Sequence, residues 1–145
     1  MRKKLFKLLF SEEYKALYRD ELTGIFNRRY LRENEEKYRA YLFIDVNKFK
    51  KYNDTYGHQK GDHVLKEVAM QLKNFSSEPV RYGGDEFVLG FRREVSQDFL
   101  RRISSEIKAA VKKTGVEISI GASETINKAD ELMYQDKRGV SPALA

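Results

Sequence analysis

The pattern of apolar and polar positions predicts short strands alternating with amphipathic helices. Residues 41–46 are apolar except for Asp45, which is typical of a central strand covered on both faces. Residues 80–91 alternate with period two on either side of Gly83 and Gly84, which predicts a hairpin. We expect the glycine pair to supply the φ > 0 backbone that a tight turn needs.

Helical periodicity accounts for most of the remaining residues. Apolar side chains recur at i, i+3, i+4 and i+7, and capping residues and glycines mark several helix ends. We expect helices over residues 11–19, 25–38, 48–57, 61–72, 96–113 and 129–138 and a further strand over 116–121. This order predicts one sheet of about four or more strands flanked by helices, an α/β or α+β sandwich.

The composition limits the kinds of site that the chain can build. It has 145 residues, enough for one domain, of which 41% are hydrophobic and 34% charged. With no cysteine and only two histidines, a bound metal would be held by oxygen ligands, which favours magnesium, manganese or calcium. The net charge of +6 permits an anionic partner. The lysines are scattered rather than interleaved with aromatic residues, which argues against nucleic acid.

The beginning of the chain allows several interpretations. Residues 1–19 are expected to form an amphipathic helical segment ahead of a domain over residues 20–145. That segment could pack on its own domain, pair with a partner helix in a dimer, or contact an anionic membrane surface weakly through residues 1–10. No apolar run reaches the length of about 18 residues that spans a membrane. A secretory signal is also not evident, so the expected location is cytoplasmic.

Three carboxylates are candidates for chemistry. Asp45 ends the apolar strand, where an acid is costly to bury and where α/β proteins often place ligand-binding groups. Asp85 and Glu86 lie at the hairpin turn, and adjacent carboxylates repel each other unless they are solvated or bind a cation. If the two strands are neighbours, these side chains converge at one end of the sheet. Such a group suits magnesium ions that also bind phosphate oxygens of a substrate.

Five ordered blocks resemble the GGDEF domain, the catalytic unit of diguanylate cyclases. They are DELTGIFNRR at 20–29, FIDVNKFKKYNDTYGHQKGD at 43–62, an intact GGDEF at 83–87, SIGA at 119–122 and ADELMYQDK at 129–137. The resemblance implies the palm-like fold of nucleotide cyclases and polymerases, with a central, mostly antiparallel sheet. It also implies that two GTP molecules are condensed into cyclic di-GMP with release of two pyrophosphates. Each subunit of a homodimer would hold one GTP.

The resemblance implies roles for the acidic residues. Asp45, Asp85 and the backbone carbonyl of Val46 would hold two Mg²⁺ or Mn²⁺ ions in each active site. Glu86 would assist at the same site by helping to deprotonate the 3′-hydroxyl. The catalytic residues would therefore be Asp45, Asp85 and Glu86.

Further residues are implied in substrate binding. Asn53 and Asp62 would recognise guanine, because a carboxylate can accept from its N1–H and amino group, a donor pair that adenine lacks. An acid in the first turn of a helix can also simply stabilise the helix dipole. The other implied contacts are His58 beside the nucleotide, Phe49 and Lys50 beside the phosphates, and Lys137 at the triphosphate.

Three residues in the matching blocks have other interpretations. Arg81 could serve the site or pair with an acid at the surface. Asn27 and Arg28 are interpreted as architectural residues that cap or brace the helix they begin.

The chain also departs from the family pattern. Asn47 stands where many members have a second aspartate, and residues 74–77 read NFSS in place of Arg-x-x-Asp, so we expect no product inhibition at that position. The loop at 123–127 is shorter than usual for the family. Residues 137–140 lack the usual basic continuation, so some of the family's triphosphate contacts have no matching residue here. Two alternative functions are a regulator that binds GTP or cyclic di-GMP without turnover and a relative that makes another cyclic nucleotide.

Overall fold

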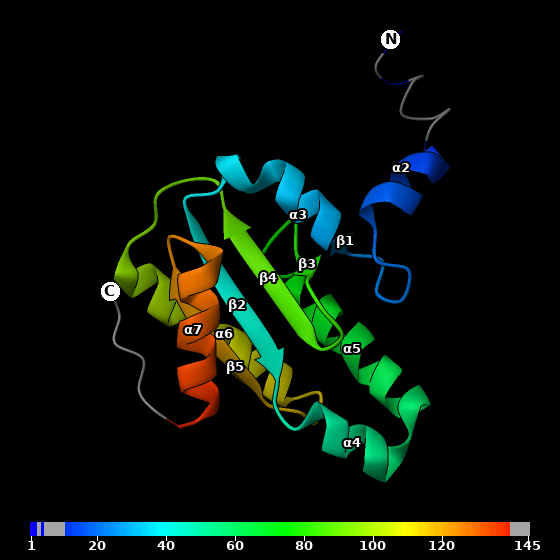
Figure 1. Cartoon of the computed structure of the whole chain (residues 1–145), viewed down its shortest axis with the longest axis vertical. Helices are drawn as coiled ribbons and strands as arrows, with labels where there is room; N and C mark the ends of the chain where they lie inside the picture. The colour runs from blue at the N-terminus through cyan, green and yellow to red at the C-terminus, as the bar shows by residue number, and fades with distance from the viewer. Residues whose placement is uncertain (3, 5–10, 140–145) are drawn as a thin grey trace.

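A mixed five-stranded sheet forms the centre of the computed structural model, which describes residues 1, 2, 4 and 11–139 (Figure 1). The strand order is β1-β3-β4-β2-β5. Strand β2 pairs antiparallel with β4 and β5, β4 pairs antiparallel with β3, and β1 pairs parallel with β3. The bounds are β1 (Phe26–Asn27), β2 (Ala40–Val46), β3 (Val80–Arg81), β4 (Glu86–Phe91) and β5 (Ile118–Ser123). The prediction of a mostly antiparallel sheet is confirmed.

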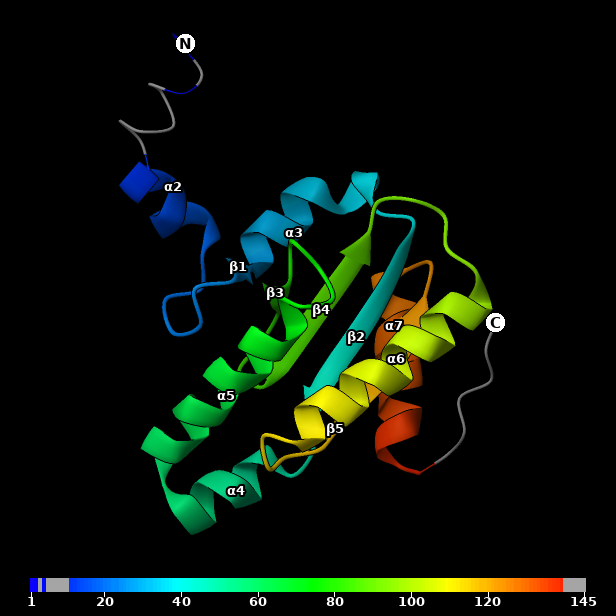
Figure 2. The same cartoon turned by 180° about the vertical axis from the view of Figure 1, so that it is seen from behind.

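Helices cover both faces of this sheet. Helices α3 and α7 lie on the face seen in Figure 1, and α5 and α6 lie on the opposite face seen in Figure 2. The helical bounds are α2 (Ser11–Tyr18), α3 (Arg28–Asn34), the 3₁₀ turn η1 (Glu35–Lys37), α4 (Phe49–Tyr56), α5 (His58–Leu72), α6 (Gln97–Lys112) and α7 (Ile126–Lys137). The sandwich expected from the order of elements is confirmed.

Strand β2 is the doubly covered central strand that its apolar run predicts. All of its residues are buried. Leu42 and Ile44 belong to the core beneath α5 and α6, whereas Tyr41 and Phe43 belong to the core beneath α3 and α7. Because strand side chains alternate between faces, Asp45 points to the same side as Tyr41 and Phe43. The carboxylate at the end of this strand therefore faces the layer that contains α3 and α7.

Several predicted boundaries are wrong, and backbone pairing explains the clearest case. The helix expected over residues 25–38 begins only at Arg28, because Phe26 pairs with Val80 and its amide donates to Pro79. Asn27 caps α3 by accepting from the Tyr30 amide at 3.1 Å, as expected of a cap. Helices α5 and α7 each begin three residues earlier than expected, and β5 is shifted by two residues along the chain.

The beginning of the chain makes few contacts where it is described. Helix α2 buries none of its residues, and Tyr14 and Leu17 remain 45% and 42% exposed. Tyr18 joins it to α3 through the Tyr30 ring and a hydrogen bond to Glu33. Residues 5–10, which carry part of the predicted amphipathic stripe, lie outside the described residues. Within the described residues, no helix is long and apolar enough to cross a membrane.

Helix α7 packs closely on β5 because residue 121 of that strand is a glycine. A Cβ at Gly121 would lie 2.0 Å from the Ala129 carbonyl oxygen and 2.1 Å from the Met133 amide nitrogen. Both atoms belong to the backbone of α7, so no side-chain rotation could make room. This contact determines how closely α7, and Lys137 at its end, approach the sheet.

Gly121→Ala should lower the free energy of unfolding by about 3 kcal/mol, because the added methyl group overpacks against backbone atoms. Urea unfolding followed by circular dichroism measures the loss. Gly84→Ala is the matched control, since its Cβ would meet no atom within 4 Å. We expect the control to change stability by less than about 0.5 kcal/mol. Equal stabilities of the two variants would contradict this packing.

Candidate active site

Three carboxylates meet where β2 ends and β4 begins. Asp45 lies opposite Glu86 in the register of these strands. The Val46 amide donates to the Asp85 backbone carbonyl at 3.1 Å, and the Asp85 charge raises the pKa of Asp45. The predicted convergence of these acids at one end of the sheet is thus present in the structure.

Asp45 is the most strongly constrained of these groups. It is only 5% exposed, and its Oδ2 accepts a hydrogen bond from Lys137 Nζ at 2.5 Å. Burial raises the pKa of Asp45, the Asp85 charge raises it further, and the Lys137 ammonium opposes both effects. The hydrogen bond to Asp45 in turn raises the pKa of Lys137. Lys137 therefore reaches the acidic end of the sheet, where it pairs with Asp45.

Glu86 lies in an acidic environment. Burial raises its pKa most, and the charges of Asp45, Asp130 and Asp85 raise it further, while Arg28 has a weaker opposite effect. A carboxylate whose pKa is raised is a stronger base than one in water. Glu86 is therefore suited chemically to accept a proton from a hydroxyl group.

The two glycines of the hairpin have a different role from the one we expected. Neither Gly83 nor Gly84 is among the residues with positive φ, so the prediction that the turn requires this conformation is wrong. A Cβ at Gly83 would instead lie 2.4 Å from Glu86 Oε1. The glycine leaves room for the Glu86 side chain, whose backbone carbonyl also accepts from the Tyr82 amide at 2.8 Å.

Arg81 braces this turn. Its guanidinium donates to the Gly84 carbonyl at 2.8 Å and forms an ion pair with Asp20 at 3.2 Å. Of the two interpretations of Arg81, pairing with an acid is the one found. Asp20 also accepts hydrogen bonds from the amide and hydroxyl of Thr23. The loop that precedes β1 is thereby tied to the hairpin.

Asn53, on α4, turns its side chain toward Gly61 of α5 and has an unsatisfied polar atom. Its Oδ1 is buried and has no hydrogen-bond partner, and a Cβ at Gly61 would lie 1.7 Å from it. A buried polar atom without a partner is costly unless a ligand or water satisfies it. The neighbouring side chains of His58 and Asp62 are exposed. Asn53 therefore fits the guanine-recognition role that the resemblance implies.

The loop that leads from β2 into α4 presents backbone donors. Lys48 adopts a left-handed conformation with φ of 55°, and no side chain caps the beginning of α4. Left-handed and right-handed residues in succession form a concave group of amides that suits an anion. Phe49 is half-buried here and packs beside Gly61, while Lys50 is exposed. The backbone geometry of this loop thus suits the phosphate contacts implied for Phe49 and Lys50.

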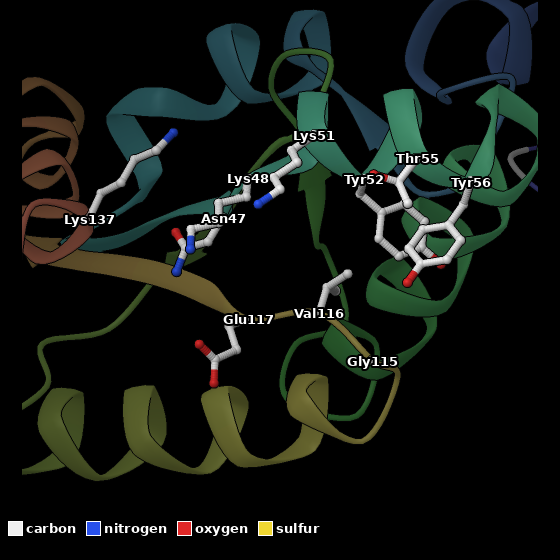
Figure 3. A pocket seen from close by; sticks show the side chains of 10 residues that line it. All are labelled: Asn47, Lys48, Lys51, Tyr52, Thr55, Tyr56, Gly115, Val116, Glu117 and Lys137. Carbon is white, nitrogen blue, oxygen red and sulfur yellow. The ribbon is translucent and has the colours of Figure 1, made fainter.

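A hollow of about 540 Å³ adjoins this loop (Figure 3). Its lining comes from the loop and α4, from the segment before β5, and from the end of α7: Asn47, Lys48, Lys51, Tyr52, Thr55, Tyr56, Gly115, Val116, Glu117 and Lys137. Lys137 is shared with the carboxylate group, because it also donates to Asp45. The acidic end of the sheet and a largely basic hollow are therefore adjacent.

The carboxylates fit hard divalent cations only in combination with other oxygen donors. Among the described residues, no three His, Cys, Asp or Glu side chains form a ready metal site. Asp45 and Asp85 provide two carboxylates, and Val46 provides a backbone carbonyl. Magnesium usually keeps several waters and binds through one or two carboxylates plus substrate phosphate oxygens. The donor set therefore fits magnesium better than a metal enclosed by protein ligands alone.

Sequence reasoning did not identify every group near these acids. The charge of Asp130, on α7, raises the pKa of Glu86. The sequence identified only the motif block at 129–137 that contains Asp130, with no role for this residue. Arg28 was interpreted as architectural, but its guanidinium lies 4.1 Å above the Tyr82 ring at the hairpin. Neither proximity could be read from spacing, because α3, α7 and the hairpin are far apart in the sequence.

Comparison with known proteins gives consistent sequence matches. The family described as "Diguanylate cyclase, GGDEF domain" matches residues 17–141. Response regulator PleD of Caulobacter vibrioides is 36% identical over 152 residues, and Diguanylate cyclase DosC of Escherichia coli is 36% identical over 151 residues. These matches cover 81% and 82% of this chain but 33% of each relative. The chain thus spans about a third of the length of these relatives.

A solved structure gives the same result for the fold. The coiled coil and GGDEF domain of DgcB from Caulobacter crescentus, in complex with c-di-GMP, matches with a TM-score of 0.79 and 26% identity. The match covers 95% of this chain and 90% of that one. The intact hairpin, the palm-like sheet and these matches lead to one conclusion: the chain belongs to the GGDEF domain family of diguanylate cyclases.

Proposed function

We propose that this chain condenses two GTP molecules into cyclic di-GMP and releases two pyrophosphates. Two copies would face each other, each holding one GTP, and divalent cations, Mg²⁺ or Mn²⁺, would bind in pairs at each site. The observation that carries the proposal is the proximity of Asp45, near the end of β2, to Asp85, in the turn just before β4, with Lys137 bonded to Asp45. We include a cytoplasmic location in the proposal, since the substrate is a cellular nucleotide.

The acidic residues would bind the cations and accept a proton at the reacting centre. Asp45, Asp85 and the Val46 carbonyl would hold the cations. When bound, divalent cations lower the pKa of an attacking hydroxyl and neutralise charge on the departing pyrophosphate. Glu86 would accept the proton of the 3′-hydroxyl, a role that its raised pKa supports. Phosphoryl transfer depends mainly on such positioning and electrostatic stabilisation.

Other residues would position the nucleotide. Asn53 and Asp62 would bind the guanine edge, where the buried Asn53 Oδ1 offers an acceptor without a partner. His58 would lie beside the nucleotide. The phosphates would lie along the loop after β2, contacted by Phe49, Lys50 and Lys137.

The acidic hairpin would complete only half of the reaction. One GTP supplies the 3′-hydroxyl and the other supplies the α-phosphate, and each of two linkages needs both. A site that holds a single GTP must therefore face a second copy of itself. Homodimerisation is accordingly part of the proposal.

The first test supplies GTP or ATP with magnesium at high protein concentration and separates the products by mass. We expect cyclic di-GMP and pyrophosphate from GTP, and no comparable product from ATP. Absence of any cyclic dinucleotide, with GTP still bound, would instead support the regulator alternative. Formation of another cyclic nucleotide would support the third alternative.

Asp85→Asn should reduce turnover by about a thousandfold or more, since it removes a charge that would hold the cations while preserving the side-chain shape. The melting temperature should remain close to that of the wild type, and binding of Mn²⁺, followed by electron paramagnetic resonance, should weaken. Glu94→Gln, exposed beyond the far end of β4, is the control and should behave as wild type. Unchanged product formation by Asp85→Asn would refute the metal assignment.

Asp62→Ser should loosen the preference for GTP over ATP by about tenfold or more, because it removes an acceptor for two guanine donors. The ratio of kcat/KM for the two nucleotides measures the change. Because α5 begins at His58, Asp62 lies beyond its first turn, and the helix-dipole interpretation of this residue is wrong. Asp98→Ser, the same substitution at an exposed position of α6, is the control. An unaltered ratio in Asp62→Ser would refute its role in guanine recognition.

A further inference from the structure

Arg28 is a cation held at the hairpin without an acidic partner. Arg29 pairs with Glu33, Arg81 with Asp20 and Arg92 with Glu78. No described carboxylate forms an ion pair with Arg28, which is exposed at the first position of α3. An unpaired surface arginine is usually mobile, but this one is fixed by an aromatic side chain.

Tyr82 fixes the Arg28 guanidinium in two ways. The guanidinium carbon lies 4.1 Å from the Tyr82 ring centroid, and one terminal nitrogen donates to the Tyr82 hydroxyl at 2.9 Å. The ring itself packs edge-on against Phe43, with 5.0 Å between centroids. The Tyr82 amide donates to the Glu86 carbonyl. The cation is therefore connected through a rigid chain of contacts to the residue that follows Asp85.

Several acids lie at this end of the sheet, where a cation would offset their charge. Asp45, Asp85, Glu86 and Asp130 act on one another there, and a phosphate group would add further negative charge. Arg81 is already committed to Asp20 and to the hairpin backbone. Lys137 acts on Asp45 and Arg28 acts on Glu86, each lowering the pKa of that acid.

The Arg28 guanidinium also has N–H groups that make no hydrogen bond to the described residues. The hydrogen bond to Tyr82 uses one of its five N–H groups, and no other described residue accepts from it. A planar guanidinium with free N–H groups matches the geometry of phosphate oxygens. Stacking on the ring pre-organises it, so less conformational entropy is lost when a ligand binds.

We propose that Arg28, held by Tyr82, binds the non-bridging oxygens of the phosphoryl group transferred at the acidic hairpin. The inference rests on the proposed function and adds a substrate contact to it. Arg28 would stabilise the charge that develops as pyrophosphate departs. The earlier interpretation of Arg28 as a helix brace is thereby replaced.

Arg19 offers a matched control for this proposal. Its guanidinium lies 3.8 Å from the Phe26 ring centroid, and one nitrogen approaches the Gly24 carbonyl at 3.5 Å, with no described ion-pair partner. It thus has the same stacked arrangement without the neighbouring carboxylates. Methionine at either position keeps an apolar stem on the ring and removes the charge.

Arg28→Met should lower kcat/KM by about 100-fold, the usual cost of losing one donor to a transition-state oxygen. Arg19→Met should stay within about twofold of wild type, and Arg28→Lys should recover part of the loss. Isothermal titration calorimetry measures ligand binding and does not depend on turnover. Arg28→Met should weaken binding of a non-hydrolysable GTP analogue but leave binding of guanosine, which has no phosphate, unchanged.

Equal weakening of analogue and guanosine binding would identify Arg28 as a structural brace and overturn the proposal. A kcat/KM for Arg28→Met equal to that of Arg19→Met would do the same. If Arg28→Met does not fold, Tyr82→Phe, which keeps the ring and frees the guanidinium, replaces it with the same expected directions. A wild-type protein without turnover would refute the proposed function, while the two binding measurements would still decide the role of Arg28.

Discussion

The structure depends on one buried carboxylate at the end of its central strand. Burying the charge of Asp45 costs free energy unless an opposite charge and hydrogen bonds compensate. Lys137 supplies that charge from the last turn of α7, which must lie close to β5 for the side chain to reach. The bare backbone at Gly121 allows this approach. The register of β2 with β4 then places Glu86 beside the same carboxylate, with Asp85 next to it in the chain.

A second polar cluster, at the other end of β4, has a charge balance different from that of the acids at the hairpin. Glu78 accepts from the hydroxyls of Tyr30 and Tyr38 and pairs with Arg92 at 2.6 Å. Burial alone would raise the pKa of Glu78, but Arg92 and the two hydroxyls lower it overall. Its charge is balanced within the protein. At the hairpin end the acids outnumber the nearby cations, so that cluster is suited to bind further positive charge and phosphate.

Some elements could be predicted from local pattern, and others could not. The apolar run of β2 and the periodicity of α6 identified a central strand and a capped helix, because both patterns reflect burial of their own residues. The pairing of Phe26 depends on Val80, a residue far along the chain, so a local pattern read it as helix. The hairpin glycine is a similar case: Gly83 does not have a positive φ angle, and its missing Cβ leaves room for Glu86 Oε1.

The sequence by itself determined the family, the mostly antiparallel sandwich and the identity of the acids, because motif blocks and apolar periodicity are properties of neighbouring residues. Only the tertiary structure decided which charges neutralise one another. It paired Arg81 with Asp20, brought Lys137 to Asp45, and left Arg28 on Tyr82 without an acidic partner. The physical reason is that these contacts join elements far apart in the chain, and electrostatic effects depend on distance in space rather than in sequence.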